Sequence, residues 1–204
     1  MTDLTFYTNP MSRGRIVRWM LEETGAPYET VLVDLADKGD LARLNPMGKV
    51  PVLVHGGTVV TEAAAICAWL ADAFPDAGLA PPVESPLRAS YYRWLFFAAG
   101  PVEAAVSNTA MGFAVPPERE GMIGYGSLDR VLDTIETALA GGGYLIGDRF
   151  TAADLYLGAQ IGWGMAFGTM QARPGFEAYV ARLDARPAAI RAREIDDALL
   201  PARG

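Results

Sequence analysis

The stretch NPMGKVPVL, residues 45–53, decides how the first part of the chain is interpreted. Asn-Pro and Gly-Lys introduce a short apolar strand, and Pro51 then interrupts that strand at its second residue. Because proline has no backbone N–H to give to a sheet, it is normally excluded from the interior of a strand. The sequence therefore predicts that the backbone around Pro51 does something other than pair within a sheet.

The residues before this stretch predict a strand, a helix and a second strand in succession. Residues 4–8 (LTFYT) are typical of a strand, and residues 12–24 show an apolar helical period that a glycine and a proline then end. Residues 28–34 (YETVLVD) alternate in character as a second strand does. A polar connection, helical or irregular, leads from there to residue 45.

The residues after Pro51 predict a hairpin and a helix. VPVLV and TVVT, residues 50–54 and 58–61, are joined by HGG, whose two glycines can take a positive φ in a tight turn. A helix that starts near Glu62 follows, with its apolar residues on one side. The order is one β-α-β unit joined to one β-β-α unit, and we expect it to form an α/β domain over residues 1–77.

The second half of the chain has a different residue pattern. Residues 74–86 (FPDAGLAPPVESP) contain four prolines and predict a linker without regular structure. Strand signals disappear beyond it, and we expect an all-helical domain over residues 86–204. The stretches with a helical pattern are 87–112, 118–140, 151–166 and 174–185.

FTAADL, residues 150–155, is the sharpest local signal in this helical half. Thr151 can cap the backbone of Asp154, Asp154 can reach back to Thr151, and Phe150 can pack on Leu155. The motif predicts the start of one buried helix and has a structural role.

Composition and charge exclude several classes of partner. The chain has 204 residues and a net charge of −7, which opposes binding to nucleic acid or to anionic membranes. Its one cysteine, Cys67, and one histidine, His55, leave no internal disulfide framework and no Cys/His metal cluster. We expect Cys67 to be an inert core residue and His55 to be exposed and without a role. Since no leader or membrane-spanning stretch is visible, a cytoplasmic location is expected.

Several segments in a fixed order resemble a known family. NPMGKVPVL is followed by TEAAAICAWLAD, the proline-rich linker, GDRFTAADLYLGAQ and YVARLDARPAAIRA. This combination resembles the cytosolic glutathione S-transferases, of bacterial type, over nearly the whole chain. The resemblance implies a thioredoxin-like α/β N-terminal domain (βαβ-ββα), an all-α helical-bundle C-terminal domain and a homodimer.

The resemblance also explains the interrupted strand. In the family the proline that matches Pro51 is cis, and the bend leaves the N–H and C=O of Val50 free to pair with glutathione as an added strand would. Glu62 would bind the α-amino group of the γ-glutamyl moiety, and the start of its helix would bind the carboxylate. Ala63 stands where the family usually has a serine, so glutathione binding is expected to be weaker than typical. The expected glutathione-binding residues are Lys49, Val50, Pro51, Glu62 and Ala63.

One hydroxyl near the first helix is enough to activate the glutathione thiol, without a metal or a general base. Lowering the thiol pKa from about 8.5 to about 6.5 takes roughly 2.7 kcal/mol, and one hydrogen bond to a charged group supplies about 1.5 to 3 kcal/mol. Ser12 is the preferred donor because SRGRIVRW resembles the Ser-Arg start of several bacterial and fungal members. Tyr7, Asn9 and Thr8 stay open as alternatives, and an ordinary helix cap would also account for Ser12. The segment has no cysteine, which argues against the members that form mixed disulfides with glutathione.

The leading interpretation is a detoxifying enzyme that positions glutathione as a thiolate for attack on a small hydrophobic electrophile. Two alternatives stay open: a non-catalytic protein that binds glutathione or apolar ligands, and a glutathione-dependent isomerase or ether-cleaving enzyme. The electrophile pocket is expected in the helical domain, where aromatic residues and methionines are dense. They are Tyr91, Tyr92, Trp94, Phe96, Phe97, Met111, Phe113, Trp163, Met165 and Phe167. We expect no more than a third of them to face a ligand, the others being core.

Overall fold

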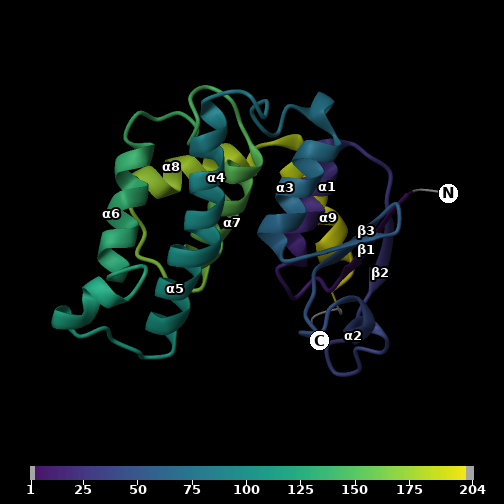
Figure 1. Ribbon diagram of the computed structural model, residues 1–204, viewed down its shortest axis with the longest axis horizontal. Coiled ribbons are helices and arrows are strands. Elements are labelled where there is room, and N and C mark those ends of the chain that lie inside the picture. The colour runs from purple at the N-terminus through teal and green to yellow at the C-terminus, as the bar shows by residue number, and fades with distance from the viewer. Residues whose placement is uncertain (1–2, 201–204) are drawn as a thin grey trace. The chain divides into compact units, whose positions relative to one another are not determined.

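The structure is a computed structural model that describes residues 3–200 (Figure 1). The chain divides into two compact units. The first comprises the residues up to Ala80 together with those from Ala185 onward, and the second comprises Pro81–Asp184. The last part of the chain thus returns to the first unit. The boundaries 1–77 and 86–204 stay a prediction about independent domains.

The first unit is built on a four-stranded sheet with the order β2-β1-β3-β4. Its strands are β1 (Leu4–Thr8), β2 (Glu29–Leu32), β3 (Val52–His55) and β4 (Thr58–Thr61). β1 and β2 run parallel, as a strand-helix-strand crossover requires, and β3 is antiparallel to both β1 and β4. The expected β-α-β and β-β-α halves therefore join through the pair β1 and β3, which confirms the thioredoxin-like fold.

The β2 strand is shorter and more exposed than its sequence predicts. All four of its residues are solvent-exposed, because β2 lies at the edge of the sheet with only β1 as a neighbour. Val33, the next residue, is buried, and its N–H donates to the Thr8 carbonyl at 2.8 Å. An alternating pattern in the sequence therefore does not give a half-buried strand here.

Within residues 3–200, the α-helices of the first unit are α1 (Gly14–Thr24), the short α2 (Leu41–Leu44), α3 (Ala63–Ala73) and α9 (Pro187–Ala198). The apolar period of α1 is buried at Ile16, Val17, Met20 and Leu21. α9 packs against α1 (Figure 1) and was not predicted as a separate helix. Its start follows the preference of proline for the first position of a helix.

The second unit is all-helical, with α4 (Leu87–Phe97), α5 (Glu103–Ala110), α6 (Leu128–Leu139), α7 (Ala152–Ala166) and α8 (Pro174–Asp184). The predicted helix 87–112 is interrupted by a π-helical turn, Ala98–Val102, that contains Pro101. The Ala98 carbonyl accepts a hydrogen bond from Gln160 Nε2 at 3.1 Å. The predicted helix 118–140 is wrong in its first part, where only a 3₁₀ turn, Pro117–Met122, forms.

The predicted capping box at the start of α7 is present. Asp154 Oδ2 accepts from Thr151 N and from Thr151 Oγ1, both at 2.9 Å. Phe150 and Leu155 are buried as the motif requires. The linker, predicted to be irregular, contains one 3₁₀ turn at Pro75–Ala77.

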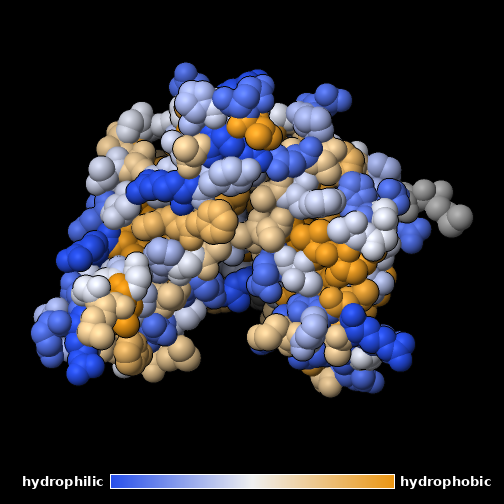
Figure 2. Space-filling view, viewed as in Figure 1, coloured by the Kyte–Doolittle hydropathy of each residue, from blue (hydrophilic) through white to orange (hydrophobic). Residues whose placement is uncertain are grey.

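Each unit leaves some large apolar side chains in contact with solvent. In Figure 2, hydrophobic residues gather over the sheet of the first unit, and the exposed strand residues include Val31, Leu32 and Val59. In the second unit, the exposed apolar residues on α4 are Leu87, Tyr92 and Phe96. Across residues 3–200, we find no helix of a length and apolarity suited to crossing a membrane.

Candidate functional site

The strand register brings the predicted glutathione-site segments to one end of the sheet. β1 runs towards Thr8, β3 starts at Val52 opposite Tyr7, and β4 ends at Thr61 opposite Val52. The loop after β1, the residues before β3 and the residue after β4 must therefore leave the sheet at the same end. These are the segments that contain Ser12, Val50 and Glu62.

The loop Asn9–Ser12 is held by a set of short hydrogen bonds. Asn9 Nδ2 donates to the Val33 carbonyl at 2.9 Å, and Asn9 Oδ1 accepts from Met11 N at 2.8 Å. Both ends of the Asn9 amide are thus used within the protein. Ser12 Oγ donates to the Asn9 carbonyl at 2.7 Å and accepts from Gly14 N at 3.0 Å. Ser12 lies two residues before α1, half-buried, with its hydroxyl oriented by two backbone groups.

Thr8 and Tyr7 occupy opposite faces of β1. Thr8 is fully buried, and a Cβ at Gly14 would collide with Thr8 Oγ1, so only glycine fits at that position. Tyr7 packs with Leu44 and Val50 against a small buried cluster on the α2 side. It also lines a cavity of about 400 Å³ between β2 and α2. Tyr7 and Ser12 thus have different surroundings.

The loop before β3 has the geometry that the opening stretch predicts. The Val50–Pro51 peptide bond is cis, which confirms that prediction. Asn45 is buried, and its Nδ2 donates to the Lys49 carbonyl at 2.8 Å while its Oδ1 accepts from Met47 N at 3.0 Å. The ladder of β3 starts only at Val52, so Val50 lies outside it. Lys49 itself is exposed.

Asn45 was overlooked as a site-building residue, although it is the first letter of the quoted stretch. Its side chain spans the turn from Met47 to Lys49 and so sets the approach of the chain to the cis bond. An asparagine that bonds the backbone two residues on is a known turn former. That signal was available in the sequence.

Glu62 has an unusual backbone conformation. Its φ is +67° and its ψ is 121°, and within the described part of the chain it is the one non-glycine residue with positive φ. Such a conformation costs of order 1 to 3 kcal/mol and is concentrated at functional sites. Glu62 is exposed and precedes the first residue of α3, Ala63, which is buried. The outlier therefore coincides with a predicted binding residue.

The structure agrees with the expectation for Cys67 but not with that for His55. Cys67 is fully buried in α3 and burial raises the pKa of its thiol far above the ordinary value, so it is the core residue that was expected. The expectation for His55 was wrong. His55 Nδ1 accepts from Trp69 Nε1 at 3.1 Å, and the His55 ring stacks on Phe74. Among residues 3–200 we find no group of three or more His, Cys, Asp or Glu side chains placed to hold a metal.

The aromatic and methionine side chains proposed for the electrophile pocket divide by exposure. Tyr91 and Trp94 are buried in the second unit and belong to its core. Five of the ten are exposed, namely Tyr92, Phe96, Met111, Phe113 and Phe167. The exposed members lie on α4, at the end of α5 and just after α7.

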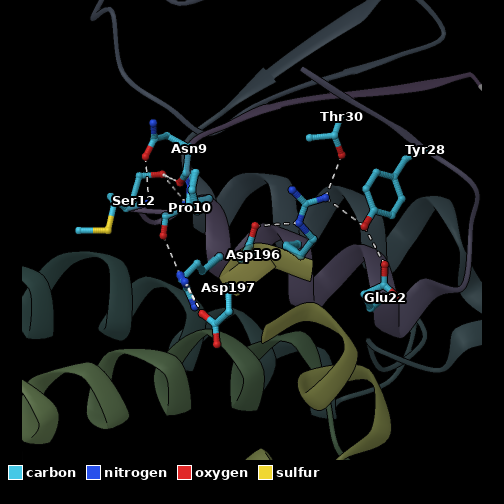
Figure 3. Close-up of polar contacts among 12 residues, drawn as sticks. Asn9, Pro10, Ser12, Glu22, Tyr28, Thr30, Asp196 and Asp197 are labelled. Carbon is cyan, nitrogen blue, oxygen red and sulfur yellow. Dashed lines mark hydrogen bonds and ion pairs between the residues drawn. The ribbon is translucent and has the colours of Figure 1, made fainter. Parts of the chain in front are cut away.

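A network around Arg18 was missed by sequence reasoning. The Arg18 side chain is 1% exposed, and its Nε donates to Asp196 Oδ1 of α9 at 3.0 Å. Its Nη1 donates to Thr30 Oγ1 at 2.8 Å and to the Tyr28 hydroxyl at 3.2 Å (Figure 3). Burial is the main reason why the pKa of Tyr28 is raised to about 12. The only hint in the sequence is an arginine within the apolar period of α1.

Comparison with known proteins finds the same family in both parts of the chain. The model of the glutathione S-transferase N-terminal domain matches residues 11–73, and that of the C-terminal domain matches residues 103–182. Glutathione S-transferase GstA of Escherichia coli O157:H7 is 32% identical over 186 residues, which are 88% of this chain and 89% of that protein.

Solved structures of glutathione transferases are also similar to this chain. A glutathione transferase from Methylococcus capsulatus has a TM-score of 0.80 and 32% identity, covering 96% of this chain and 99% of the other. A sphingomonad glutathione S-transferase complexed with glutathione has a TM-score of 0.78 and 30% identity, covering 95% and 98%.

Proposed function

Because the chain belongs to the glutathione S-transferase family and is a glutathione transferase, we propose that it conjugates reduced glutathione, bound as a thiolate, to a small hydrophobic electrophile. The observation that carries this proposal is the common end of the sheet at which three segments meet. They are the loop with Ser12, the cis bond after Val50, and the strained Glu62 at the start of α3.

Each part of the glutathione tripeptide has a partner of suitable chemistry at this end. Val50 lies outside the ladder, so its N–H and C=O can pair with the cysteinyl backbone as a strand would. The Glu62 carboxylate suits the α-amino group of the γ-glutamyl moiety. The amino end of α3 suits the neighbouring carboxylate, because free N–H groups and the helix dipole favour an anion. Lys49, Pro51 and Ala63 lie beside these groups in sequence.

Among the candidate donors to the thiolate, Ser12 is the best supported. The Asn9 amide is already hydrogen-bonded to backbone groups at both ends, Thr8 is fully buried, and Tyr7 lines the cavity beside α2. Ser12 would exchange its bond to the Asn9 carbonyl for one to sulfur. The Asn9 carbonyl would still accept from Ser12 N at 3.1 Å, so the exchange leaves no buried acceptor unpaired. The N–H of Gly14 donates to Ser12 Oγ and polarises the hydroxyl further.

Three further features belong to the proposal: the class of electrophile, the homodimer and the location. Exposed aromatic side chains in the second unit support an apolar electrophile, and a detoxifying role follows from that substrate class. A homodimer is supported by the exposed apolar residues of each unit, and its test is the mass in light scattering. A cytoplasmic location is the expectation from the sequence.

The proposal is tested by adding glutathione and a panel of small electrophiles to the purified protein. We expect a thiolate absorbance that depends on pH and conjugate formation with at least one electrophile. Binding without turnover would indicate a carrier. Turnover that returns free glutathione would indicate an isomerase or an ether-cleaving enzyme.

Ser12→Ala should raise the pKa of the bound thiol by more than one unit, because a lost bond of about 2 kcal/mol has that effect. Glutathione affinity should change little. The matched variants are Tyr7→Phe and Asn9→Ala, measured by thiolate absorbance against pH. A shift in Tyr7→Phe with none in Ser12→Ala would assign the donor to Tyr7.

Ala63→Ser should tighten glutathione by about 1 kcal/mol, which is roughly fivefold. The reason is that the added hydroxyl stands at the first residue of α3 and can donate to the γ-glutamyl carboxylate. Titration calorimetry measures the effect, with Ala64→Ser as the control one residue further along the same helix. Unchanged affinity for Ala63→Ser would mean that this carboxylate is bound elsewhere.

A further inference from the structure

Arg15 connects the last helix of the chain to the loop that carries Ser12. It stands in the first turn of α1, and its Nε donates to the Pro10 carbonyl at 2.7 Å. Its Nη2 donates to Asp197 Oδ1 of α9 at 2.6 Å (Figure 3). One guanidinium thus contacts residues that are 187 positions apart in the sequence. All these residues belong to the first unit.

The Pro10 carbonyl is a distinct fixing point of this loop. Asn9 holds the beginning of the loop to Val33, and Met11 and Ser12 are held by bonds to Asn9. These bonds fix the loop to the residue after β2 and to itself. Of its described hydrogen bonds, the one from Arg15 is the bond that ties it to a side chain of α1. The direction of the Arg15 side chain is in turn set by Asp197.

We propose that Arg15 and Asp197 are positioning residues for the glutathione thiolate: Asp197 on α9 orients Arg15, and Arg15 holds the Pro10 carbonyl so that Ser12 keeps its hydroxyl at the reacting sulfur. This inference rests on the proposed function, and specifically on Ser12 as the donor. Neither residue needs to touch glutathione. Their effect on the reaction passes through the loop Asn9–Ser12.

The direction in which Asp197→Asn moves the pKa of the bound thiol distinguishes positioning from simple electrostatics. Asp197→Asn removes a negative charge from the first unit, and a loss of negative charge alone favours a thiolate and lowers its pKa. Positioning predicts the opposite, because a neutral amide holds Arg15 less firmly and the loop loses its fixed arrangement. Asp196 is a further charge that interacts with this pair, since Arg15 attracts it and Asp197 repels it. Asp196 remains unchanged in the variant.

Arg15→Lys distinguishes a bridging role of Arg15 from an effect of its positive charge alone. Lysine keeps the positive charge but carries one nitrogen, so it cannot donate to Pro10 and Asp197 in the fork geometry of arginine. If Arg15 acts only as a charge, Arg15→Lys should behave as wild type. If Arg15 acts as a bridge, Arg15→Lys should resemble Arg15→Gln.

The chain offers a matched control in Arg191 and Glu22. Arg191 Nε lies 3.3 Å from Glu22 Oε2, so this pair also joins α9 to α1. The side chains are 52% and 16% exposed, similar to 52% for Asp197 and 24% for Arg15. Arg191→Gln therefore weakens the attachment of α9 to α1 without touching the loop. It reports any effect that comes merely from loosening the helix.

The experiment measures the pKa of bound glutathione by thiolate absorbance, together with kcat and KM across pH, for these variants. For Asp197→Asn, Arg15→Gln and Arg15→Lys we expect the bound-thiol pKa to rise by about half a unit, which is about a threefold loss of kcat below that pKa. The loss should vanish at high pH, where the thiol is ionised in every variant. KM for glutathione should not change, and Arg191→Gln should match wild type throughout.

Several outcomes would overturn the inference. A lowered thiol pKa in Asp197→Asn, wild-type behaviour of Arg15→Lys, or an equal shift in Arg191→Gln would each do so. Failure of the proposed function is seen separately, because wild type itself would then show no thiolate signal or no turnover. Hydrogen exchange of residues 11–14 supplies a readout independent of chemistry, and faster exchange in Arg15→Gln than in Arg191→Gln is expected. Equal exchange would also count against the bridge.

Discussion

Two aspartates, one in each unit, are almost completely buried yet are stabilised in different ways. Asp154 in α7 accepts four hydrogen bonds, from Leu145 N, Tyr179 Oη and both donors of Thr151. Asp196 in α9 accepts one hydrogen bond, from Arg18 Nε, while its Oδ2 and Arg18 Nη2 have no hydrogen-bond partner among the described residues. Asp154 is held by neutral donors, most of them close in sequence. The donor to Asp196 is a cation 178 positions away in the sequence.

The difference shows which buried charge is the more vulnerable. In both aspartates burial is the main effect and raises the pKa of the carboxyl, although their hydrogen-bond donors act in the opposite direction. Four donors satisfy both oxygens of Asp154, so removal of one leaves the others in place. Removal of Arg18 would leave Asp196 buried without its hydrogen-bonded cation, and only the weaker attraction of Arg15 would remain. The attachment of α9 to α1 therefore depends more on one residue than the start of α7 does.

Replacement of Arg18 should have the largest effect. Arg18→Met leaves the Asp196 carboxylate buried without its cation, and breaking a buried pair in this way costs about 3 to 5 kcal/mol. The rings of Phe6 and Tyr28, now beside the guanidinium, would pack against the methionine instead. Urea unfolding at neutral pH measures the change in the free energy of unfolding.

The double variant Arg18→Met/Asp196→Leu is the control for this prediction. Replacing a buried ion pair by apolar residues is often neutral or stabilising, so most of the lost stability should return. If the double variant is as unstable as Arg18→Met, the loss comes from the cavity and the lost bonds to Thr30 and Tyr28. The contrast with Asp154 would then fail.

Replacement of Asp154 should cost less, about 2 to 3 kcal/mol. Asp154→Ala removes the capping box and leaves the half-buried donor of Leu145 and the buried donors of Thr151 and Tyr179 short of an acceptor. The control is Asp129→Ala, an exposed acid in the first turn of α6, which should change stability by less than about 0.5 kcal/mol. A loss for Asp154→Ala above that of Arg18→Met would reverse the comparison.

The same contrast explains what the sequence could predict. The capping box lies within six consecutive residues, and its spacing alone identifies it. The turn of β3 and β4 was equally local, and Gly56 and Gly57 both have positive φ as expected. The interruption of the strand at Pro51 could also be predicted locally, because proline within a strand is compatible with few backbone conformations.

Long-range pairing could not be predicted in the same way. Arg18 and Asp196 are single charged letters in helices, and nothing local distinguishes them from residues on a solvated face. The same is true of Arg15 and Asp197. The positive φ of Glu62 runs against the preference of a non-glycine residue, so nothing in its own identity predicts it. Sequence reasoning thus reached the segments of the candidate site but not the attachments that hold them.

The pH dependence of stability should give the smallest effect. Because the pKa of Asp196 is raised in the folded protein, its stabilising contribution is present below the ordinary value of about 3.9 and is lost as the pH rises through the folded pKa. Asp196→Asn cannot ionise, so its free energy of unfolding minus that of wild type should increase with pH in this window. The slope cannot exceed about 1.4 kcal/mol per pH unit for one proton. Urea unfolding from pH 4 upward measures this slope.

The control for this prediction is Asp154→Asn, which should give a slope of the same sign. A slope of opposite sign for Asp196→Asn alone would mean that attraction by Arg18 outweighs burial. The ion pair would then be a net source of stability at neutral pH.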